Sequence, residues 1–309
     1  MKKMINKTRV EGYLYQHTLE LKTSGENSKN PGTQFITGNI DIATDDAMTN
    51  IVTVHFTYTT ATTSSGKSNA TFNVLKDIID NKLQNVMAHG ADNAACLAID
   101  SAIGLNEFYS DRNGTPELVS AKRNEGGFVR VVSSINEDEK MRNTFDCDMV
   151  ITQTRMIEAD DEKNLPEKLI VKGAIFDFRN GLLPVDFSVL NPNAISYFEG
   201  LGVSSTNPVF TRIQGRQISE VVKRTTTQES AFGEPIVRTY SSTRKDYVIT
   251  WAAAEPYEWD SEDSITASDM KKAMTDRETY LATLKARQDE YKASKNAPAA
   301  APAQGGFNF

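Results

Sequence analysis

The chain has 309 residues, a formal net charge of −7 at pH 7 and a hydrophobic fraction of 39%. This length suits one large domain or two small ones, and no run of about 18 apolar residues is present that would cross a membrane as a helix. The acidic balance argues against a nonspecific polycation for duplex DNA, but not against a local basic groove.

The sequence gives no indication of secretion, metal binding or a cofactor. The basic start, Met1 to Lys7, is not followed by an apolar segment, so we expect no secretory signal. Cys96 and Cys147 lie in apolar, strand-like contexts and are expected to be free thiols, with a disulfide as the unsupported alternative. No CxxC pair occurs and the three histidines lie far apart, which argues against zinc. We therefore expect an intracellular protein without a metal or cofactor.

The first part of the chain is predicted to form three strands, a helix and two more strands. Apolar and polar residues alternate along the strands, as in residues 51–60. The helix is predicted over residues 72–87, capped by Asn69 or Thr71, because its apolar residues follow helical spacing. The predicted strands cover residues 8–21, 34–42, 51–60, 95–109 and 118–132. This β-β-β-α-β-β order is that of the OB fold, a small barrel with its helix between the third and fourth strands.

The second part repeats the same order of elements without visible residue identity. Its predicted strands cover residues 145–157, 168–178, 183–189, 209–222 and 237–252. A short helix is expected over residues 191–199, with Pro192 in its first turn. The sequence therefore predicts a mainly β chain with two tandem OB-like antiparallel barrels, over residues 1–135 and 144–254. The polar segment 133–143 is the predicted linker.

Residues 255–309 differ in character from the barrels. An acidic segment leads to a charged helix over about 267–292, for which Thr266 is the expected N-cap. Since this helix has few apolar residues, we expect it to face solvent or to dock weakly. The Ala/Pro/Gly-rich end is predicted to be disordered, and its aromatic residues Phe307 and Phe309 form a candidate partner-docking tip. The alternative is a terminus without a role.

The strand over residues 209–222 is the best candidate for nucleic-acid binding. OB folds bind single strands by stacking bases on exposed aromatic rings while Lys and Arg follow the phosphates. Phe210, Arg212, Gln214 and Arg216 alternate, so they project from one side of this strand. In the alternative interpretation, Phe210 packs at a barrel end and the arginines are simply solvated.

Further candidates lie on other strands and turns. Which side the aromatic residues of the last strand face, Tyr240, Tyr247 and Trp251, is left open by the sequence, and they cannot all face outward. In the first unit, the candidates surround the Asn-Gly turn and the Gly-Gly pair before Phe128. The remaining candidate nucleic-acid contacts are Arg244, Lys245, Lys122, Arg123, Arg130, Tyr109 and Arg112.

Three stretches carry a family resemblance: NSKNPGTQFITGNIDIATDD, FYSDRNGTPELVSAKRNEGGF and NPVFTRIQGRQIS. With the barrel order and the aromatic-ended tail, the chain resembles single-stranded DNA-binding proteins of phages that infect Gram-positive bacteria. Bacterial proteins of this class end in an acidic tip with a terminal Phe. Phe309 matches that pattern, whereas the acidic residues lie upstream, at Asp260, Glu262 and Asp263.

The resemblance implies a passive protein in the cytoplasm of the bacterial host. It would bind and protect single-stranded DNA without strong sequence preference during phage DNA replication and recombination. Its tail would recruit phage or host replication or recombination proteins. The sequence leaves open the oligomeric state, the site size and the preference for DNA or RNA.

An enzyme is not expected, and a phage virion structural protein is the alternative. Residues 64–68 (SSGKS) are similar to the end of a P-loop, but the upstream glycine is absent. No ordered Ser/His/Asp set provides acid–base chemistry. A capsid or tail component would form oligomers through large apolar interfaces and would lack affinity for nucleic acid.

Overall fold

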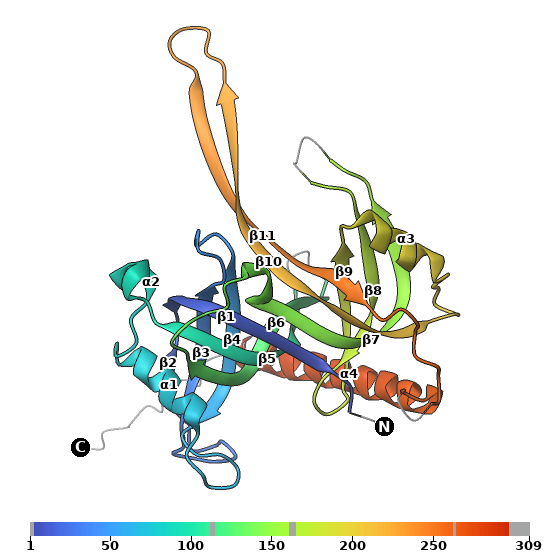
Figure 1. Ribbon diagram of the computed structural model, residues 1–309. Coiled ribbons are helices and arrows are strands. Elements are labelled where there is room, and N and C mark those ends of the chain that lie inside the picture. The colour runs from blue at the N-terminus through green and yellow to red at the C-terminus, as the bar shows by residue number, and fades with distance from the viewer. Residues whose placement is uncertain (1–2, 112–114, 161–164, 262–263, 297–309) are drawn as a thin grey trace, which may run out of the picture.

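The computed structural model describes residues 3–111, 115–160, 165–261 and 264–296, without the side chains of residues 220–223, 241, 244 and 294–296. Eleven strands form one sheet that closes on itself twice, so that two barrels lie side by side (Figure 1). A two-stranded arm projects from the second barrel, and a long C-terminal helix lies along the base of both barrels.

The first barrel closes in the strand order of an OB fold. β1 pairs antiparallel with β3 and β5, β3 pairs with β4, and β5 pairs with β6. The parallel contact between β4 and β6 completes the ring, and β2 extends it at one edge. The elements are β1 (Asn6–His17), β2 (Glu20–Thr23), β3 (Gln34–Ala43), β4 (Ile51–Thr60), α1 (Ala70–Ile79), α2 (Val86–His89), η1 (Ala91–Asn93), β5 (Cys96–Ser110) and β6 (Glu117–Val131).

Helix α1 covers one end of the first core and is shorter than the sequence predicts. The Asn69 side chain accepts a hydrogen bond from the Thr71 N–H, as expected for an N-cap. Leu75 and Ile78 are fully buried among the strand side chains of the first core. The helix ends at Ile79 because Asn81 adopts a left-handed φ of 57°, although apolar spacing continues beyond it.

The second barrel closes in the same way. β7 pairs with β8 and β10, β8 pairs with β9, and β10 pairs with β11. A parallel contact between β11 and β9 completes the ring. The elements are β7 (Asn143–Ile157), β8 (Lys168–Phe176), β9 (Leu182–Val189), α3 (Pro192–Gly200), β10 (Val209–Gln228) and β11 (Ile236–Ala252). These pairings confirm the predicted mainly β fold of two OB-like barrels.

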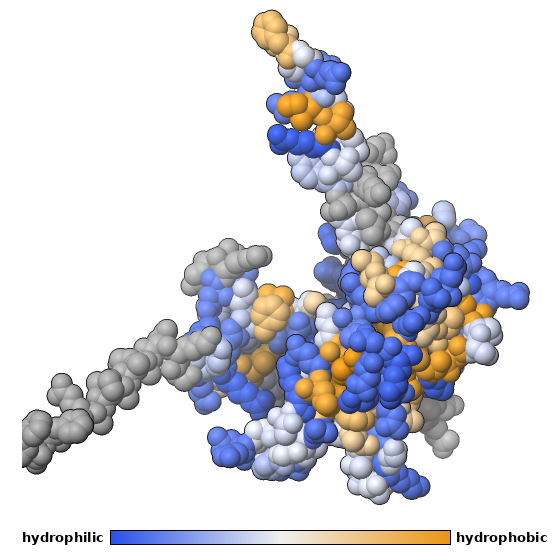
Figure 2. All heavy atoms as spheres, turned by 90° about the vertical axis from the view of Figure 1, so that its left-hand side faces the viewer, coloured by the Kyte–Doolittle hydropathy of each residue, from blue (hydrophilic) through white to orange (hydrophobic). Residues whose placement is uncertain are grey.

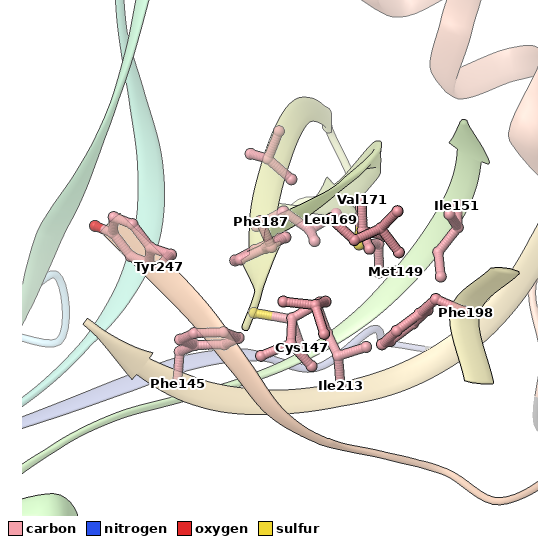
Figure 3. Close-up of a cluster of buried hydrophobic side chains, with 14 of the residues drawn as sticks. Phe145, Cys147, Met149, Ile151, Leu169, Val171, Phe187, Phe198, Ile213 and Tyr247 are labelled. Carbon is pink, nitrogen blue, oxygen red and sulfur yellow. The ribbon is translucent and has the colours of Figure 1, made fainter. Parts of the chain in front are cut away.

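The second core is filled from the inward side of every strand of its barrel and from α3. Phe145, Cys147 and Met149 alternate along β7 toward the interior, where Phe187 and Phe198 meet them (Figure 3). Ring centroids of Phe145 and Phe187 lie 5.0 Å apart. Each such buried side chain contributes on the order of 2 kcal/mol to stability. This packing fixes which residues of the surrounding strands face outward.

The two barrels are joined by a shared sheet and by buried amides. β1 pairs antiparallel with β7, so Arg9 lies opposite Thr144. The buried side chains of Asn124 on β6 and Gln217 on β10 exchange two hydrogen bonds, of 2.7 and 2.8 Å. The predicted linker packs on the first barrel, since the Asn136 N–H donates to the Glu11 carboxylate at 2.6 Å. It contains η2 (Glu139–Met141). The predicted domain boundaries stay predictions.

Helix α4 (Ala267–Asn296) contacts both barrels, which the sequence did not predict. Ala273 is buried in a third apolar cluster against the outside of the second barrel. The Arg277 guanidinium forms a two-pronged ion pair with Glu107 on β5, in which the Glu107 side chain is buried and the Arg277 side chain is partly exposed. The Gln288 amide bonds the Tyr109 backbone on the same strand. None of the helices in the described part of the chain is long and apolar enough to cross a membrane.

Candidate nucleic-acid interface

β10 and β11 form a continuous antiparallel ribbon that begins in the second barrel and ends as the projecting arm. Paired residues run from Ile213 opposite Ala252 to Gln228 opposite Ile236. Thr211 and Ile213 are fully buried inside the barrel, so the alternate residues of β10 face outward. The predicted orientation of this strand is therefore right.

One side of the ribbon gathers arginines and aromatic rings. Directly opposite residues of an antiparallel pair lie on the same face. Trp251 lies opposite Gln214, and Tyr240 lies opposite Arg224. Tyr240 and Trp251 are 54% and 48% exposed. We call this side the outer ribbon face, defined by Arg212, Gln214, Arg216, Arg224, Arg238, Tyr240 and Trp251.

Phe210 has the outward orientation but is not exposed, which corrects its predicted role in stacking. Only 1% of the residue is accessible. The C-terminal segment covers it, with the Tyr257 ring centroid at 4.8 Å and the Trp259 centroid at 6.0 Å. The Tyr257 N–H also donates to the Phe210 carbonyl oxygen at 2.8 Å. The exposed aromatic ring near this end of the face is Trp251 instead.

Arg212 and Arg216, the two arginines predicted to lie on the same side of the strand as Phe210, differ in their charge partners. Arg212 forms a two-pronged ion pair with Asp146 on β7, at 2.8 and 2.5 Å, and this hydrogen bonding raises the pKa of Arg212. Arg216, between Thr144 and Val248, has no ion pair with any described residue. Its Nε atom is buried and has no hydrogen-bond partner among the described residues. Arg216 therefore keeps more of its charge available than Arg212.

The arm carries the exposed cations of the face. Arg224 on β10 and Arg238 on β11 are exposed, and neither forms an ion pair with another described residue. Lys245 lies on the face of the ribbon opposite to these arginines, because it is paired with Ser219, whose side chain is buried. Lys245 itself is exposed. The side chain of Arg244 lies outside the described part of the structure.

Lys122 lies between the barrels. Its Nζ atom is 2.7 Å from the Asp186 carboxylate on β9 and also bonds the Asp186 carbonyl oxygen. The same atom lies 5.3 Å from the Phe187 ring centroid and 5.1 Å from that of Tyr247. Lys122 therefore covers the end of the second core, and its predicted contact with phosphate would compete with these interactions.

Arg123 and Arg130 are each paired with a carboxylate. Arg123 lies 2.8 Å from Glu125. Arg130 lies 2.6 Å from Asp100, and Arg9 approaches the same carboxylate at 3.3 Å. These pairs reduce the charge that the two predicted residues would offer to a phosphate.

The other predicted residues are held elsewhere or fall outside the description. The Tyr109 backbone is bonded by α4, and its side chain is half-buried. Arg112, Phe307 and Phe309 lie outside the described residues. Among the described residues, no group of three or more His, Cys, Asp or Glu side chains is placed to hold a metal ion.

Sequence reasoning missed the arm residues of the outer ribbon face. Arg224 lies beyond the predicted strand over residues 209–222, and Arg238 lies at the start of the predicted strand over residues 237–252. The sequence therefore did not indicate that the two arginines share a face.

A small pocket of about 200 Å³ between α3 and the end of β11 is lined by Tyr197 and Trp251. An unpaired base that stacks on Trp251 would lie beside this pocket.

Comparisons with known proteins give a family and a distant structural neighbour. A family model described as YorF matches residues 4–287. No curated protein matches the sequence. The crystal structure of a deletion variant of the single-stranded DNA binding protein from Thermus aquaticus is similar, with a TM-score of 0.48 and 9% sequence identity. That similarity covers 85% of this chain and 100% of the other.

Proposed function

The chain belongs to the YorF family, and we propose that it binds single-stranded DNA without strong sequence preference, along the outer ribbon face. The observation that supports this proposal is the shared face of Arg216, Arg224 and Arg238 with the exposed rings of Tyr240 and Trp251. Cations beside exposed rings are the two elements that single-strand binding requires.

The chemistry of the face suits an unpaired strand. A ring that stacks on a base contributes about 1–3 kcal/mol and accepts any base, because every base has a π-face. A guanidinium group can hold a phosphate with two hydrogen bonds. Tyr240 and Trp251 lie 11 positions apart on one strand (251 − 240), or roughly 35 Å at about 3.3 Å per residue. This length accommodates several nucleotides.

Duplex DNA fits the same face less well. The bases of a duplex are stacked on each other, so that Tyr240 and Trp251 would find no free base face. The chain's net charge of −7 also opposes a mainly electrostatic attachment to the duplex. In a phage-infected cell, such a protein would protect single strands during DNA replication and recombination, with the tail as a docking segment for partner proteins.

Fluorescence anisotropy with a labelled oligo-dT of about 30 nucleotides, at low and high salt and with a duplex competitor, tests this function. We expect salt-sensitive binding that the duplex competes for poorly. Tyr240→Ser should weaken binding by about 5- to 150-fold, which corresponds to the loss of one stacked base. The matched control is Phe178→Ser, which removes a ring that is 74% exposed in the turn after β8.

Two results would contradict the proposal. No binding at low salt would remove the single-strand function and favour a virion structural protein. Equal losses from Tyr240→Ser and Phe178→Ser would show that the outer ribbon face has no special part in binding.

A further inference from the structure

The tip of the arm has a chemistry opposite to that of the ribbon below it. Phe232 is 94% exposed, and Glu229 and Glu234 lie on either side of it without basic residues between them. The Phe232 N–H donates to the Ser230 hydroxyl at 3.2 Å, and that hydroxyl bonds the Phe232 carbonyl oxygen at 2.6 Å. These two bonds tie the backbone of Phe232 to the Ser230 side chain within the loop. We call Glu229, Phe232 and Glu234 the arm tip.

The arm tip is not suited to nucleic acid. Its two carboxylates repel phosphate, and the nearest described cation along the ribbon, Arg238, lies beyond the start of β11. The exposed Phe232 ring at the end of the projecting arm is available for contact with another protein surface, where aromatic rings contribute much of the binding energy. The arm stands clear of both barrels, so its tip does not reach another surface of the same chain (Figures 1 and 2).

A complementary surface lies on the outside of the first barrel. Phe128 on β6 is 72% exposed and lies directly opposite Asp100 on β5. Arg130 and Arg9 approach that carboxylate from two sides, at 2.6 and 3.3 Å, and Arg9 also bonds the Glu11 carboxylate at 3.1 and 2.6 Å. Gly127, with a φ of 121°, allows the close approach of the two strands, because a Cβ atom there would overlap the Asp100 carbonyl oxygen. We call Phe128, Arg130 and Arg9 the Phe128 patch.

We propose that the arm tip of one copy docks on the Phe128 patch of a second copy. The Phe232 ring packs against Phe128, and the two glutamates approach the exposed guanidinium groups of Arg130 and Arg9 in competition with Asp100 and Glu11. An aromatic pair adds attraction beyond its buried area, and the opposite charges fix the orientation. Phe178 is also strongly exposed, in the turn after β8, but it is a less suitable partner for the arm tip. The arginine beside it, Arg179, already lies over the Phe178 ring, with its guanidinium carbon 4.9 Å from the ring centroid.

The contact joins two different surfaces and therefore does not close on itself. Each copy in a pair keeps one unused arm tip or one unused Phe128 patch, so further copies can add in a row. A surface this small does not hold two copies together in dilute solution, but copies on one strand have a high effective concentration. This inference rests on the proposed function, because the DNA strand brings the copies together, and it predicts cooperative binding.

Site-specific crosslinking on DNA tests the contact. Both phenylalanines are kept and the cysteines are placed near them: one copy carries Ala231→Cys, and the other carries Val131→Cys on the strand of Phe128 and a tag that makes the mixed product separable by size. Both carry Cys96→Ser, and Cys147 can stay because it is buried and burial raises its pKa. The mixture is bound to oligo-dT of about 60 nucleotides and treated with a short bismaleimide. The matched control replaces Val131→Cys by Arg179→Cys, which lies in the exposed turn beside Phe178.

We expect a mixed product from Ala231→Cys with Val131→Cys at about fivefold or higher yield than from Ala231→Cys with Arg179→Cys. Equal yields would overturn the proposal, as would efficient crosslinking of Ala231→Cys with itself, which would indicate an arm-to-arm contact. Absence of product, while anisotropy shows both variants on the DNA, would also overturn it and leave the DNA-binding function intact. If the wild-type chain does not bind oligo-dT at all, the proposed function fails first and the docking contact loses its basis.

A second variant tests the contact without crosslinking. Phe232→Ala should weaken binding to the long oligo-dT by about tenfold or more, since truncation of a central aromatic contact has effects of this size. Binding to an oligo-dT that holds a single copy should not change. Equal weakening on both lengths would show that Phe232 contacts DNA and would overturn the proposal.

Discussion

Removal of the Arg277 charge should release helix α4 from the first barrel. Arg277 on α4 holds the Glu107 carboxylate on β5 with two hydrogen bonds, one of them 2.6 Å long. The side chain of Glu107 is 2% exposed, so Arg277→Met leaves a buried carboxylate without its partner. Breaking a buried pair in this way costs about 3–5 kcal/mol. We expect a lower free energy of unfolding by that amount.

The double variant distinguishes an orphaned charge from lost packing. Replacing both residues, as in Arg277→Met with Glu107→Met, removes the buried charges together and should recover most of the loss. The Nε atom of Arg277 is itself buried without a hydrogen-bond partner among the described residues, which adds to this expectation.

Urea unfolding followed by tryptophan fluorescence measures both variants. Trp259, whose indole N–H donates to the Pro208 carbonyl oxygen at 3.3 Å, reports on the segment that leads into α4. A loss below about 1 kcal/mol for the single variant would contradict this expectation, because it would place the Glu107 carboxylate in contact with water.

Three further predictions concern the body of the protein. Gln217→Leu leaves the buried Asn124 Oδ1 atom without its donor, while the Asn124 Nδ2 atom keeps its bond to the Thr53 carbonyl oxygen, and should lower the free energy of unfolding by about 1–3 kcal/mol in urea titrations; no change would mean that water replaces the bond. Gly12→Ala places a Cβ atom closer than van der Waals contact to the Ala43 carbonyl oxygen on β3, so it should lower the melting temperature clearly. The control is Gly25→Ala, where a Cβ atom would meet nothing within 4 Å and stability should change by no more than about 0.5 kcal/mol. Burial lowers the pKa of His17, so protons bind the unfolded chain first as the pH falls through the ordinary value of 6.5. Stability should therefore decrease below that pH, and His17→Gln should reduce the decrease in a series of thermal melts; an unchanged series would show that His17 is not responsible.

The barrel order could be predicted because alternation is a local property of the sequence. The inward orientation of Thr211 and Ile213 follows from their spacing alone. The burial of Phe210 could not be predicted in the same way, since its cover comes from Tyr257, 47 positions later (257 − 210). A residue's face is set by its own strand, but its exposure depends on what else packs there.

Two other differences have similar causes. The side on which Trp251 lies depends on a β-bulge between Gln214 and Gly215, and one extra residue reverses the alternation. The docking of α4 depends on the ion pair of Arg277 with Glu107, and a charged helix with few apolar residues gives no sign of it. In both cases the deciding contact is with a distant segment.

The salt dependence of binding shows directly whether single-stranded DNA lies along the outer ribbon face. For oligo-dT, the logarithm of the affinity falls with the logarithm of the salt concentration by about 0.7 per neutralised phosphate. Arg224→Ser with Arg238→Ser removes two cations from the outer ribbon face and should lower that slope by about 1.4. Lys245→Ser, on the opposite face of the same ribbon, should leave it nearly unchanged. A similar slope for all three proteins, or a larger change from Lys245→Ser, would contradict binding along the outer ribbon face.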